Sequence, residues 1–379
     1  MQNPTLTQPL DFSHEVPAEK VGMRKEGLAA LTALFEDQIT VQNLHPAAQL
    51  VVIRHGQVIV DRALGQGRRG PINATTPFLT FSISKVFTAM GIHRLIEEGR
   101  IEMDAPIATY WPEFGCKGKE RATIRHALLH QAGIPAPGLR WQIFLWPFWG
   151  AVTHSVARLR AEYEPGSKTA YHLVNFGFIL GEVIRRVTGM PVDRYLHRQF
   201  CAPLGLQRTW MRLPRAMLRE TPRLTSDDNP FIRQAVRVFN MPIIRRSLLP
   251  AASLHSTARD LATFFQMLLN GGLYAGKRLL QADTITQATS LGYAGWDEFI
   301  QAETSWGYGF ILGGKSGEFS AMGKGSSLRT FAGFGLGSCM VWADPDADLV
   351  VAFTCNGLRG EGNEQRWAAL CDAVWDALT

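Results

Sequence analysis

Ser82 and Lys85 form the only S-x-x-K tetrad in the chain, Ser82-Ile83-Ser84-Lys85. On a helix, residues i and i+3 share a face, so the Lys85 amine can reach the Ser82 hydroxyl. A serine in the first turn also lies at the positive end of the helix dipole, which favours a developing oxyanion. A desolvated lysine with a lowered pKa can serve as the base that a serine nucleophile needs. The spacing indicates acyl transfer, although a helix start with a solvated lysine would show the same letters.

Two glycine-rich motifs match nucleotide-binding patterns by letter only. Gly65–Gly70 matches G-x-G-x-x-G, but a loop sequence with Pro71 and Pro77 follows it instead of a helix, so we expect a flexible loop. Gly309–Ser316 matches the P-loop pattern, but Phe, Ile and Leu fill its variable positions and more glycines follow. A strand running into a surface loop is the better interpretation.

The composition excludes several classes of protein. The 379 residues are 46% hydrophobic and 19% charged, which is typical of a globular chain with a sizeable core. The net charge of +6 comes from 39 basic against 33 acidic residues. No dense basic block with interleaved aromatics occurs, so nothing favours nucleic-acid binding. No H-E-x-x-H and no G-x-S-x-G is present either, and the motifs imply no metal and no cofactor.

Cysteine usage and hydropathy indicate a cytoplasmic protein. The five cysteines are odd in number and form no C-x-x-C, so reduced thiols are expected instead of disulfides or a zinc ribbon. The N-terminus shows no basic segment followed by an apolar one, as a secretory signal would. No apolar run is long enough to span a bilayer, so we expect no transmembrane segment.

The elements that must position Ser82 and Lys85 follow from periodicity and turn signals. Helices are predicted at 18–40, from Ser82 toward Gly99, and at 177–188, 192–200, 257–270 and 367–378. Strands are predicted at 49–54, 57–61, 308–312, 338–343 and 349–354. Helical segments and loops fill the stretch between, with no convincing strand pair.

This order of elements predicts an α/β (α+β) fold. An antiparallel sheet is flanked by N- and C-terminal helices, and an all-α lobe is inserted into it. We place a discontinuous α/β domain at 18–90 and 251–379 and the inserted, mainly α-helical domain at 91–250.

Several strings in a fixed order carry a resemblance to a known family. They are His45-Pro46-Ala47, Ser82-x-x-Lys85, Gly99–Pro106, Tyr110–Phe114, Thr123–Gly133, Glu164–Gly166, Tyr171-His172, Pro203–Leu206 and Asp344-Pro345. From about residue 45 to 356 the chain resembles the serine β-lactamase and penicillin-binding-protein-like superfamily. More narrowly, it is similar to family VIII carboxylesterases and β-lactamase-related serine hydrolases. The resemblance implies a β-lactamase/transpeptidase-like fold.

The resemblance also implies roles for individual residues. Ser82 matches the acyl-accepting nucleophile, Lys85 its paired base, and Tyr171 the tyrosine of a Y-x-N motif. A tyrosine held near a lysine can ionise more easily and pass protons to the leaving group. The backbone N–H groups of Ser82 and Leu336 are expected to form the oxyanion hole.

The chain departs from the family pattern at two places. Leu173 replaces the asparagine of Y-x-N. The third motif, usually Lys-Thr-Gly or His-x-Gly, becomes Gly333-Phe334-Gly335, so its basic residue is missing unless Arg329 or Lys324 reaches in from another register. A β-lactam or D-Ala peptide carries a carboxylate that this basic residue helps to bind. Its loss favours neutral esters.

Four further residues are candidates for substrate contact: His172, Gly333, Gly335 and Trp149. His172 follows the tyrosine, but a histidine inside a helical lobe is more often structural. Trp149 ends a run that also holds Trp141, Phe144, Trp146 and Phe148. That run could be lobe core, an apolar wall for an acyl chain, or a surface patch for lipid or a partner.

The expected function is hydrolysis through an acyl-enzyme, most simply by a carboxylesterase that acts on short-chain or apolar esters. A transacylase, an amide or D-peptide hydrolase and a weak β-lactamase remain open within the same chemistry. A catalytically inactive binding homologue remains open outside it. The expected partner is a small-molecule ester or amide, and the oligomeric state is undetermined.

Overall fold

One antiparallel sheet of nine strands organises the structure, a computed structural model that describes residues 8–135, 142–226, 229–314, 321–360 and 364–378. The strand order is β3-β2-β1-β14-β13-β12-β11-β10-β9. The bounds are β1 Ala47–Arg54, β2 Gln57–Gly67, β3 Gly70–Pro71, β9 Tyr293–Asp297, β10 Ala302–Trp306, β11 Ile311–Leu312, β12 Phe331–Phe334, β13 Met340–Asp344 and β14 Leu349–Cys355. Because β1 pairs with β14, the two ends of the chain share the sheet.

Three short strand pairs lie outside this sheet. They are β4 Phe78–Leu79 with β6 His255–Ser256, β5 Thr225–Ser226 with β15 Gly357–Leu358, and β7 Leu273–Tyr274 with β8 Lys277–Arg278.

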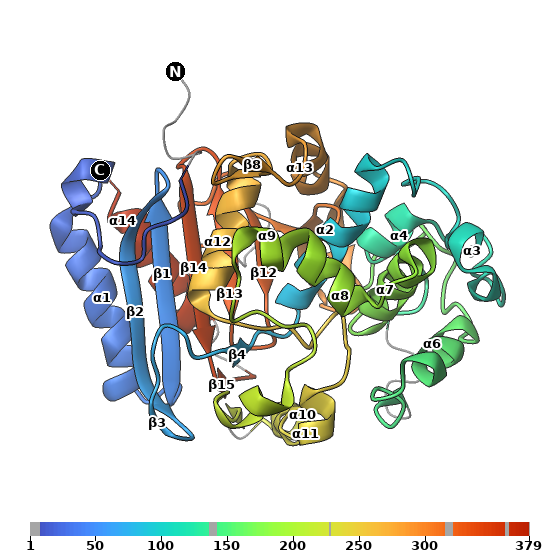
Figure 1. Cartoon of the computed structure of the whole chain (residues 1–379), viewed down its shortest axis with the longest axis horizontal. Helices are drawn as coiled ribbons and strands as arrows, with labels where there is room; N and C mark the ends of the chain where they lie inside the picture. The colour runs from blue at the N-terminus through green and yellow to red at the C-terminus, as the bar shows by residue number, and fades with distance from the viewer. Residues whose placement is uncertain (1–7, 136–141, 227–228, 315–320, 361–363, 379) are drawn as a thin grey trace.

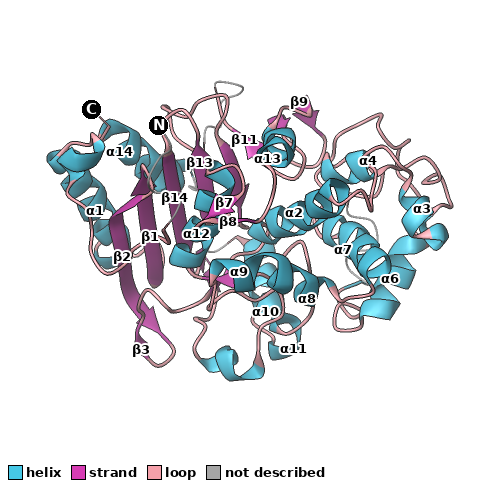
Figure 2. Ribbon diagram, turned by 45° about the horizontal axis from the view of Figure 1, so that its top comes forward, coloured by secondary structure: helices cyan, strands magenta, loops and turns pink. Residues whose placement is uncertain are grey.

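Helices cover both faces of the sheet and build a lobe at one end of it (Figures 1 and 2). The α-helices are α1 Lys25–Thr40, α2 Ile83–Glu97, α3 Ile107–Tyr110, α4 Ile124–Leu128, α6 Trp149–Ala157, α7 Asn175–Thr188, α8 Val192–Leu196, α9 Ala202–Leu204, α10 Pro230–Phe239, α11 Pro242–Arg245, α12 Ala258–Leu269, α13 Ala282–Thr289 and α14 Ala369–Asp376. Shorter 3₁₀ segments are Ala18–Val21, Pro112–Phe114 and Arg215–Arg219, and π segments are His197–Cys201 and Glu364–Ala368.

Strand periodicity divides the core into two layers. On β1, Leu50 and Val52 belong to the cluster that α1 and α14 cover. Val51 and Ile53 belong to the cluster that includes α2, α7 and α12. The latter cluster runs without interruption from the sheet into the helical lobe. It therefore includes residues of both predicted domains, whose division stays a prediction.

The predicted fold is confirmed, and several element boundaries are corrected. The predicted helix at 18–40 is broken after Val21, because Gly22 adopts the left-handed conformation (φ 65°) that ends a helix. The predicted strand at 308–312 shrinks to β11, since Gly309 has φ +104°. Strands β9 and β10 were not predicted, and β12 was expected only as the strand that carries the third motif.

The fold also shows which elements the two glycine-rich motifs form. Gly65–Gly70 is not the expected loop: β2 continues to Gly67 and turns directly into β3. No helix follows this hairpin, so its N–H groups do not form a dinucleotide site. In the second motif β11 supplies the strand, while Lys315 and Ser316 lie outside the described residues.

Helix α2 runs between the sheet and the lobe and is buried around nearly its whole circumference. Twelve of its fifteen residues are buried, which is why it shows no amphipathic pattern. It packs on α7 in the lobe and on β12 in the sheet. Its N-terminus, where Ser82 is the N-cap, therefore lies where sheet and lobe meet.

Candidate active site

Ser82 is held in place by a constrained segment that precedes α2. Phe81 has φ +47°, a conformation that costs energy for a bulky residue. The Thr80 backbone N–H and hydroxyl both donate to the Leu254 carbonyl, at 2.8 and 3.0 Å. The Phe81 ring packs against Phe239 with centroids 5.0 Å apart. These contacts fix the strained turn and keep the Ser82 hydroxyl at the helix start.

Lys85 lies one turn further on and is 4% exposed. Its Nζ lies 3.0 Å from the Ser82 Oγ, 2.8 Å from the Leu173 carbonyl oxygen and 3.2 Å from that of Ala251. Burial lowers the pKa of Lys85 well below its ordinary value. The Lys85 amine donates to both carbonyls, and in its neutral form it could do so with two N–H groups while its third position, the lone pair, accepts the proton of the Ser82 hydroxyl. The geometry is that of a nucleophile paired with its base.

Tyr171 completes the set of groups around Ser82. Its hydroxyl hydrogen-bonds to the Ser82 side chain, and its ring centroid lies 4.5 Å from the Lys85 Nζ. Desolvation nevertheless raises the pKa of Tyr171 above its ordinary value, so the expectation of an easily ionised tyrosine is wrong. The phenol stays protonated and can serve as a hydrogen-bond donor and proton donor. Leu173, in place of the motif's asparagine, contacts Lys85 through its carbonyl.

Two backbone N–H groups are available for an oxyanion. Within the described part of the chain, neither the Ser82 N–H nor the Leu336 N–H donates to a protein acceptor. Leu336 lies in the turn between β12 and β13, and β12 packs directly on α2. This juxtaposition allows the two groups to act together as an oxyanion hole.

Gly333 and Gly335 lie where β12 passes closest to the start of α2. A Cβ added at Gly335 would lie 2.5 Å from the Thr80 carbonyl oxygen, and one at Gly333 would lie 2.9 Å from the Val86 Cγ2. The structure places both candidates beside the site, where they bring strand and helix together. No side chain from either reaches a substrate.

Neither proposed substitute for the basic residue of the third motif reaches the site. Arg329 is exposed and pairs with Asp346 at 2.8 Å, and Lys324 is exposed and pairs with Asp376 at 3.0 Å. The alternative register is therefore wrong. Arg366, which is fully buried, instead donates to the carbonyls of Gly337 and Gly357 from beneath the β12–β13 turn. Through these two hydrogen bonds it supports the turn.

His172 is committed to the backbone. Its Nδ1–H donates to the Ala170 carbonyl at 2.7 Å, and its Nε2 accepts from the Ile134 N–H at 3.2 Å. Burial lowers the pKa of His172 to about 4. Both ring nitrogens are used, so this residue holds the loop beside Tyr171 and leaves no group for a substrate.

His130 is a residue that the sequence analysis did not single out. Its Nδ1 accepts from the His172 N–H at 3.1 Å, and its ring centroid lies 4.6 Å from those of Tyr171 and Trp306. Burial and the neighbouring His172 and Lys85 lower its pKa well below the ordinary value. The string Thr123–Gly133 contains this residue, but its spacing gave no signal of a contact with Tyr171.

The aromatic run around Trp149 divides between core and surface. The Trp149 indole N–H donates to the buried Glu182 carboxylate at 2.7 Å, and Trp146 is buried against Phe239. Phe144 and Phe148 are exposed, and Trp141 lies outside the described residues. No contact between described residues links Trp149 to Ser82, so its substrate role gains no support.

An apolar rim borders Tyr171 on the side of the β9–β10 hairpin. The Trp306 ring stacks on Tyr171 with centroids 5.7 Å apart and planes at 16°, and the Phe299 ring centroid lies 6.2 Å from it. Phe299 and Ile300 at the hairpin tip are 41% and 42% exposed. The sequence analysis missed this rim because it did not predict the hairpin.

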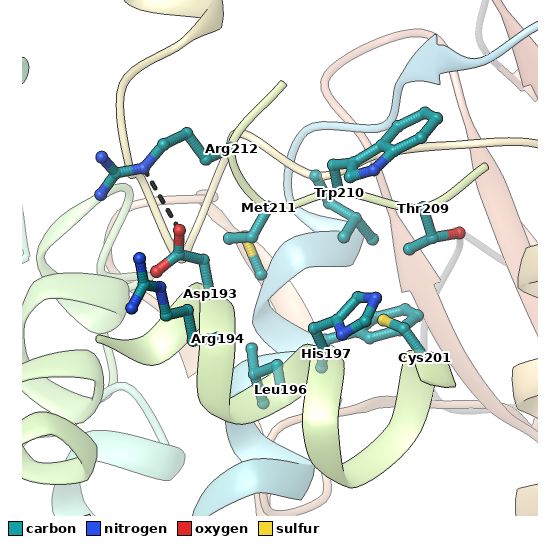
Figure 3. A pocket seen from close by; sticks show the side chains of 11 residues that line it. Asp193, Arg194, Leu196, His197, Cys201, Thr209, Trp210, Met211 and Arg212 are labelled. Carbon is teal, nitrogen blue, oxygen red and sulfur yellow. Dashed lines mark ion pairs between the residues drawn. The ribbon is translucent and has the colours of Figure 1, made fainter. Parts of the chain in front are cut away.

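A separate cavity of about 250 Å³ lies behind α2. Figure 3 shows Asp193, His197 and Cys201 at its wall and the Asp193–Arg212 ion pair, 3.3 Å long, at its edge. Ser82, Lys85 and Tyr171 do not line it, so it is not the candidate active site. Within the described ranges no group of three His, Cys, Asp or Glu side chains could hold a metal ion.

Comparison with known proteins identifies relatives over most of the chain. The family model described as Beta-lactamase matches residues 32–373. An Escherichia coli (strain K12) protein provisionally named a D-alanyl-D-alanine carboxypeptidase is 26% identical over 90% of this chain and 85% of its own length. The esterase/beta-lactamase LipL of Mycobacterium tuberculosis (strain ATCC 25618 / H37Rv) is 29% identical over 82% of this chain and 76% of its own.

A solved structure extends the similarity to three dimensions. The crystal structure of a family VIII carboxylesterase superimposes with a TM-score of 0.82 at 26% identity. The match covers 96% of this chain and 98% of that one. The predicted resemblance is thereby confirmed at the levels of sequence and fold.

Proposed function

The chain belongs to the Beta-lactamase family, and from this premise we propose that it is a carboxylesterase that cleaves apolar esters through an acyl-enzyme on Ser82. The observation that carries the proposal is the 3.0 Å contact between the Ser82 Oγ and a buried lysine with a lowered pKa. A serine hydroxyl with an adjacent neutral amine is an activated nucleophile.

In the proposed acylation, the Ser82 oxygen attacks the ester carbonyl and its proton moves to the Lys85 amine. The backbone N–H groups of Ser82 and Leu336 hold the negative carbonyl oxygen of the tetrahedral intermediate. When the C–O bond to the alcohol breaks, Tyr171 donates its proton to the departing alkoxide. The Lys85 ammonium then returns a proton to Tyr171, so the pair ends this half-reaction neutral.

In the proposed deacylation, water enters where the alcohol has left and attacks the acyl carbonyl. Lys85 and Tyr171 take the proton of the water and return one to the Ser82 oxygen as the acyl–serine bond breaks. The carboxylic acid leaves and the starting state is restored. No step requires a metal or an organic cofactor.

Two features support an apolar, uncharged ester as the substrate. The third-motif strand carries glycine where a cation would bind a substrate carboxylate, and Arg329 and Lys324 pair elsewhere. At the hairpin tip beside Tyr171, the exposed side chains of Phe299 and Ile300 offer apolar contact area, and the buried Trp306 ring packs behind Tyr171. A small-molecule ester therefore suits this site better than a β-lactam or a D-Ala peptide.

The cellular setting is part of the same proposal. The five cysteines are free, which supports a reducing, cytoplasmic compartment. In the described part of the chain no helix has the length and hydropathy to cross a membrane.

The test is hydrolysis of p-nitrophenyl esters of increasing acyl length, with nitrocefin in parallel. We expect ester turnover that falls about 10³-fold or more in Ser82→Ala, with little turnover of nitrocefin. Ser290→Ala, which changes an exposed serine in a turn, is the matched control and should keep full activity. Full ester turnover by Ser82→Ala would refute the proposal.

Labelling with a fluorophosphonate probe separates the remaining outcomes. Labelling of Ser82 without ester turnover would indicate an active nucleophile with another acyl donor, such as an amide. Absence of both would indicate a binding homologue.

A further inference from the structure

Asp297 ends strand β9 and is fully buried. One of its carboxylate oxygens, Oδ1, accepts three backbone hydrogen bonds. The donors are the N–H groups of Tyr171 at 3.0 Å, Phe299 at 2.9 Å and Ile300 at 3.0 Å. Two of these donors belong to its own hairpin tip, and the third belongs to the residue that faces Ser82.

The segment around Tyr171 is held from two sides, like a strand. On one side, the Ala170 N–H donates to the His130 carbonyl at 3.0 Å, and the His172 N–H donates to the His130 Nδ1 at 3.1 Å. On the other side, the Tyr171 N–H donates to Asp297. Among the described residues, Asp297 provides the side-chain acceptor that fixes Tyr171 from the hairpin side.

The same oxygen shapes the apolar rim. By accepting from Phe299 and Ile300, it closes the turn that carries both side chains. A backbone bond from the Glu298 N–H to the Thr169 carbonyl, 2.9 Å long, joins the turn to the Tyr171 segment. The rim and the phenol are therefore anchored at one atom.

We propose that Asp297 is a positioning residue that sets the Tyr171 hydroxyl against Ser82 and holds the apolar rim beside it. Asp297 contacts neither substrate nor the reacting atoms, and it acts through the Tyr171 backbone. This inference rests on the proposed function, because it assigns Tyr171 to proton transfer.

Three substitutions of Asp297 distinguish the effect of its hydrogen-bond acceptor from the effect of its charge. Asp297→Asn keeps an acceptor at Oδ1 and should retain kcat/KM within about threefold. Asp297→Ala removes all three bonds and should lower kcat/KM about 10- to 100-fold, mainly in kcat, since a small displacement of a catalytic group has this effect. Asp297→Ser can still close the turn with its hydroxyl but is too short to reach Tyr171. It should therefore lose kcat while keeping KM.

Asp344 provides the matched control. It is also a fully buried aspartate whose Oδ1 accepts backbone N–H groups, those of Asp346 and Ala347 at 2.8 and 2.9 Å. It ends strand β13 and has no contact with Tyr171. Asp344→Ala should lower the melting temperature as Asp297→Ala does, but it should leave kcat/KM of the folded protein unchanged.

Each outcome decides the inference. Wild-type kcat in folded Asp297→Ala or Asp297→Ser would overturn it, and so would a loss in Asp297→Asn as large as that in Asp297→Ala. The rate of fluorophosphonate labelling is measured on the same variants and needs no ester. If wild-type protein labels without hydrolysing esters, the carboxylesterase proposal fails while the labelling rates still test Asp297. If Asp297→Ala does not fold, the Ser and Asn variants carry the comparison.

Discussion

Lys85 is the residue of the candidate site whose pKa depends most on its surroundings. It is buried, and within the described part of the chain its recorded hydrogen-bond partners are the Ser82 hydroxyl and two backbone carbonyls, not a carboxylate. Its pKa is therefore lowered by desolvation, not raised by an ion pair. Burial of a lysine costs stability, and a buried lysine with a lowered pKa is a candidate for a catalytic base.

Substitution of Lys85 by methionine separates these two effects. We expect Lys85→Met to lower kcat/KM about 10²- to 10⁴-fold, since it removes the base. In wild-type protein kcat/KM should rise as the pH rises through the lowered pKa, because the neutral amine is the active form. Steady-state kinetics across the pH range check both, and a flat pH profile in wild type would contradict them.

The same residue has a consequence for stability with a definite sign. The unfolded lysine keeps its ordinary pKa of 10.5 while the folded one titrates well below it. Between these values the unfolded state binds more protons, so the free energy of unfolding should increase with pH and level off above 10.5. Urea denaturation at several pH values should show this slope in wild type and a weaker slope in Lys85→Met.

Tyr171→Phe tests the phenol with little change in packing. The ring contacts with Trp306 and His130 remain, while the proton donor is lost. We expect kcat/KM to fall about 10²- to 10⁴-fold and the free energy of unfolding to change by about 1 kcal/mol or less. Tyr195→Phe, in which a buried tyrosine of α8 far from Ser82 is changed, should leave kcat/KM unaltered.

Among the elements, the close pass of β12 over α2 determines how the site is assembled. Gly335 lets the strand approach the Thr80 carbonyl, and Gly333 lets it approach Val86. Gly333 stands where the family motif has its basic residue, Gly335 matches the glycine of that motif, and both allow the chain to pass close to helix α2. Their role is geometric, and the proposed contribution of the Leu336 N–H to an oxyanion hole depends on this close approach.

Gly335→Ala should therefore disturb both stability and catalysis. The added methyl group would clash with the Thr80 carbonyl, and we expect a loss of about 1–3 kcal/mol in unfolding free energy together with lower kcat. Gly150→Ala is the control, since a Cβ there meets nothing within 4 Å on helix α6. It should raise stability by up to about 1 kcal/mol. Urea denaturation and ester kinetics on both variants give the comparison.

What could be predicted from the sequence depends on how local each signal is. Helix α2 with Ser82 at its start and the β1–β2 hairpin follow from short-range patterns, and the order of motifs predicted the fold. The β9–β10 hairpin was missed because β9 shows no alternation of apolar and polar side chains. Its more buried positions include Gly295 and Asp297, which do not have the apolar side chains by which a strand is recognised. The role of Asp297 depends on a contact across 126 positions of sequence, which no local spacing reveals.

At the scale of the whole molecule, one core joins the sheet to the lobe. Val341 and Val350 of the sheet lie in the same hydrophobic cluster as Leu180 and Val183 of α7. Helix α2 lies between them and is buried by both. Because the sheet and the lobe share these core residues, separating the lobe from the sheet would expose apolar side chains to water.

Calorimetry should accordingly show one cooperative unfolding transition. Leu180→Ala, a change deep in the lobe, should cost about 2–5 kcal/mol and shift that single transition to lower temperature as a unit. A lobe transition that moves while a second one stays in place would show that the predicted domains unfold independently. Differential scanning calorimetry distinguishes the two results.

The number of cysteine thiols that react with a dye distinguishes the folded protein from the unfolded one. Four of the five thiols are buried, and Cys116 alone is half-exposed. A thiol-reactive dye should therefore modify one sulfur per native molecule and all five when the core opens. Dye uptake over time would report how often the core opens under native conditions, and a fluorophore confined to Cys116 would mark the lobe without touching the chemistry at Ser82.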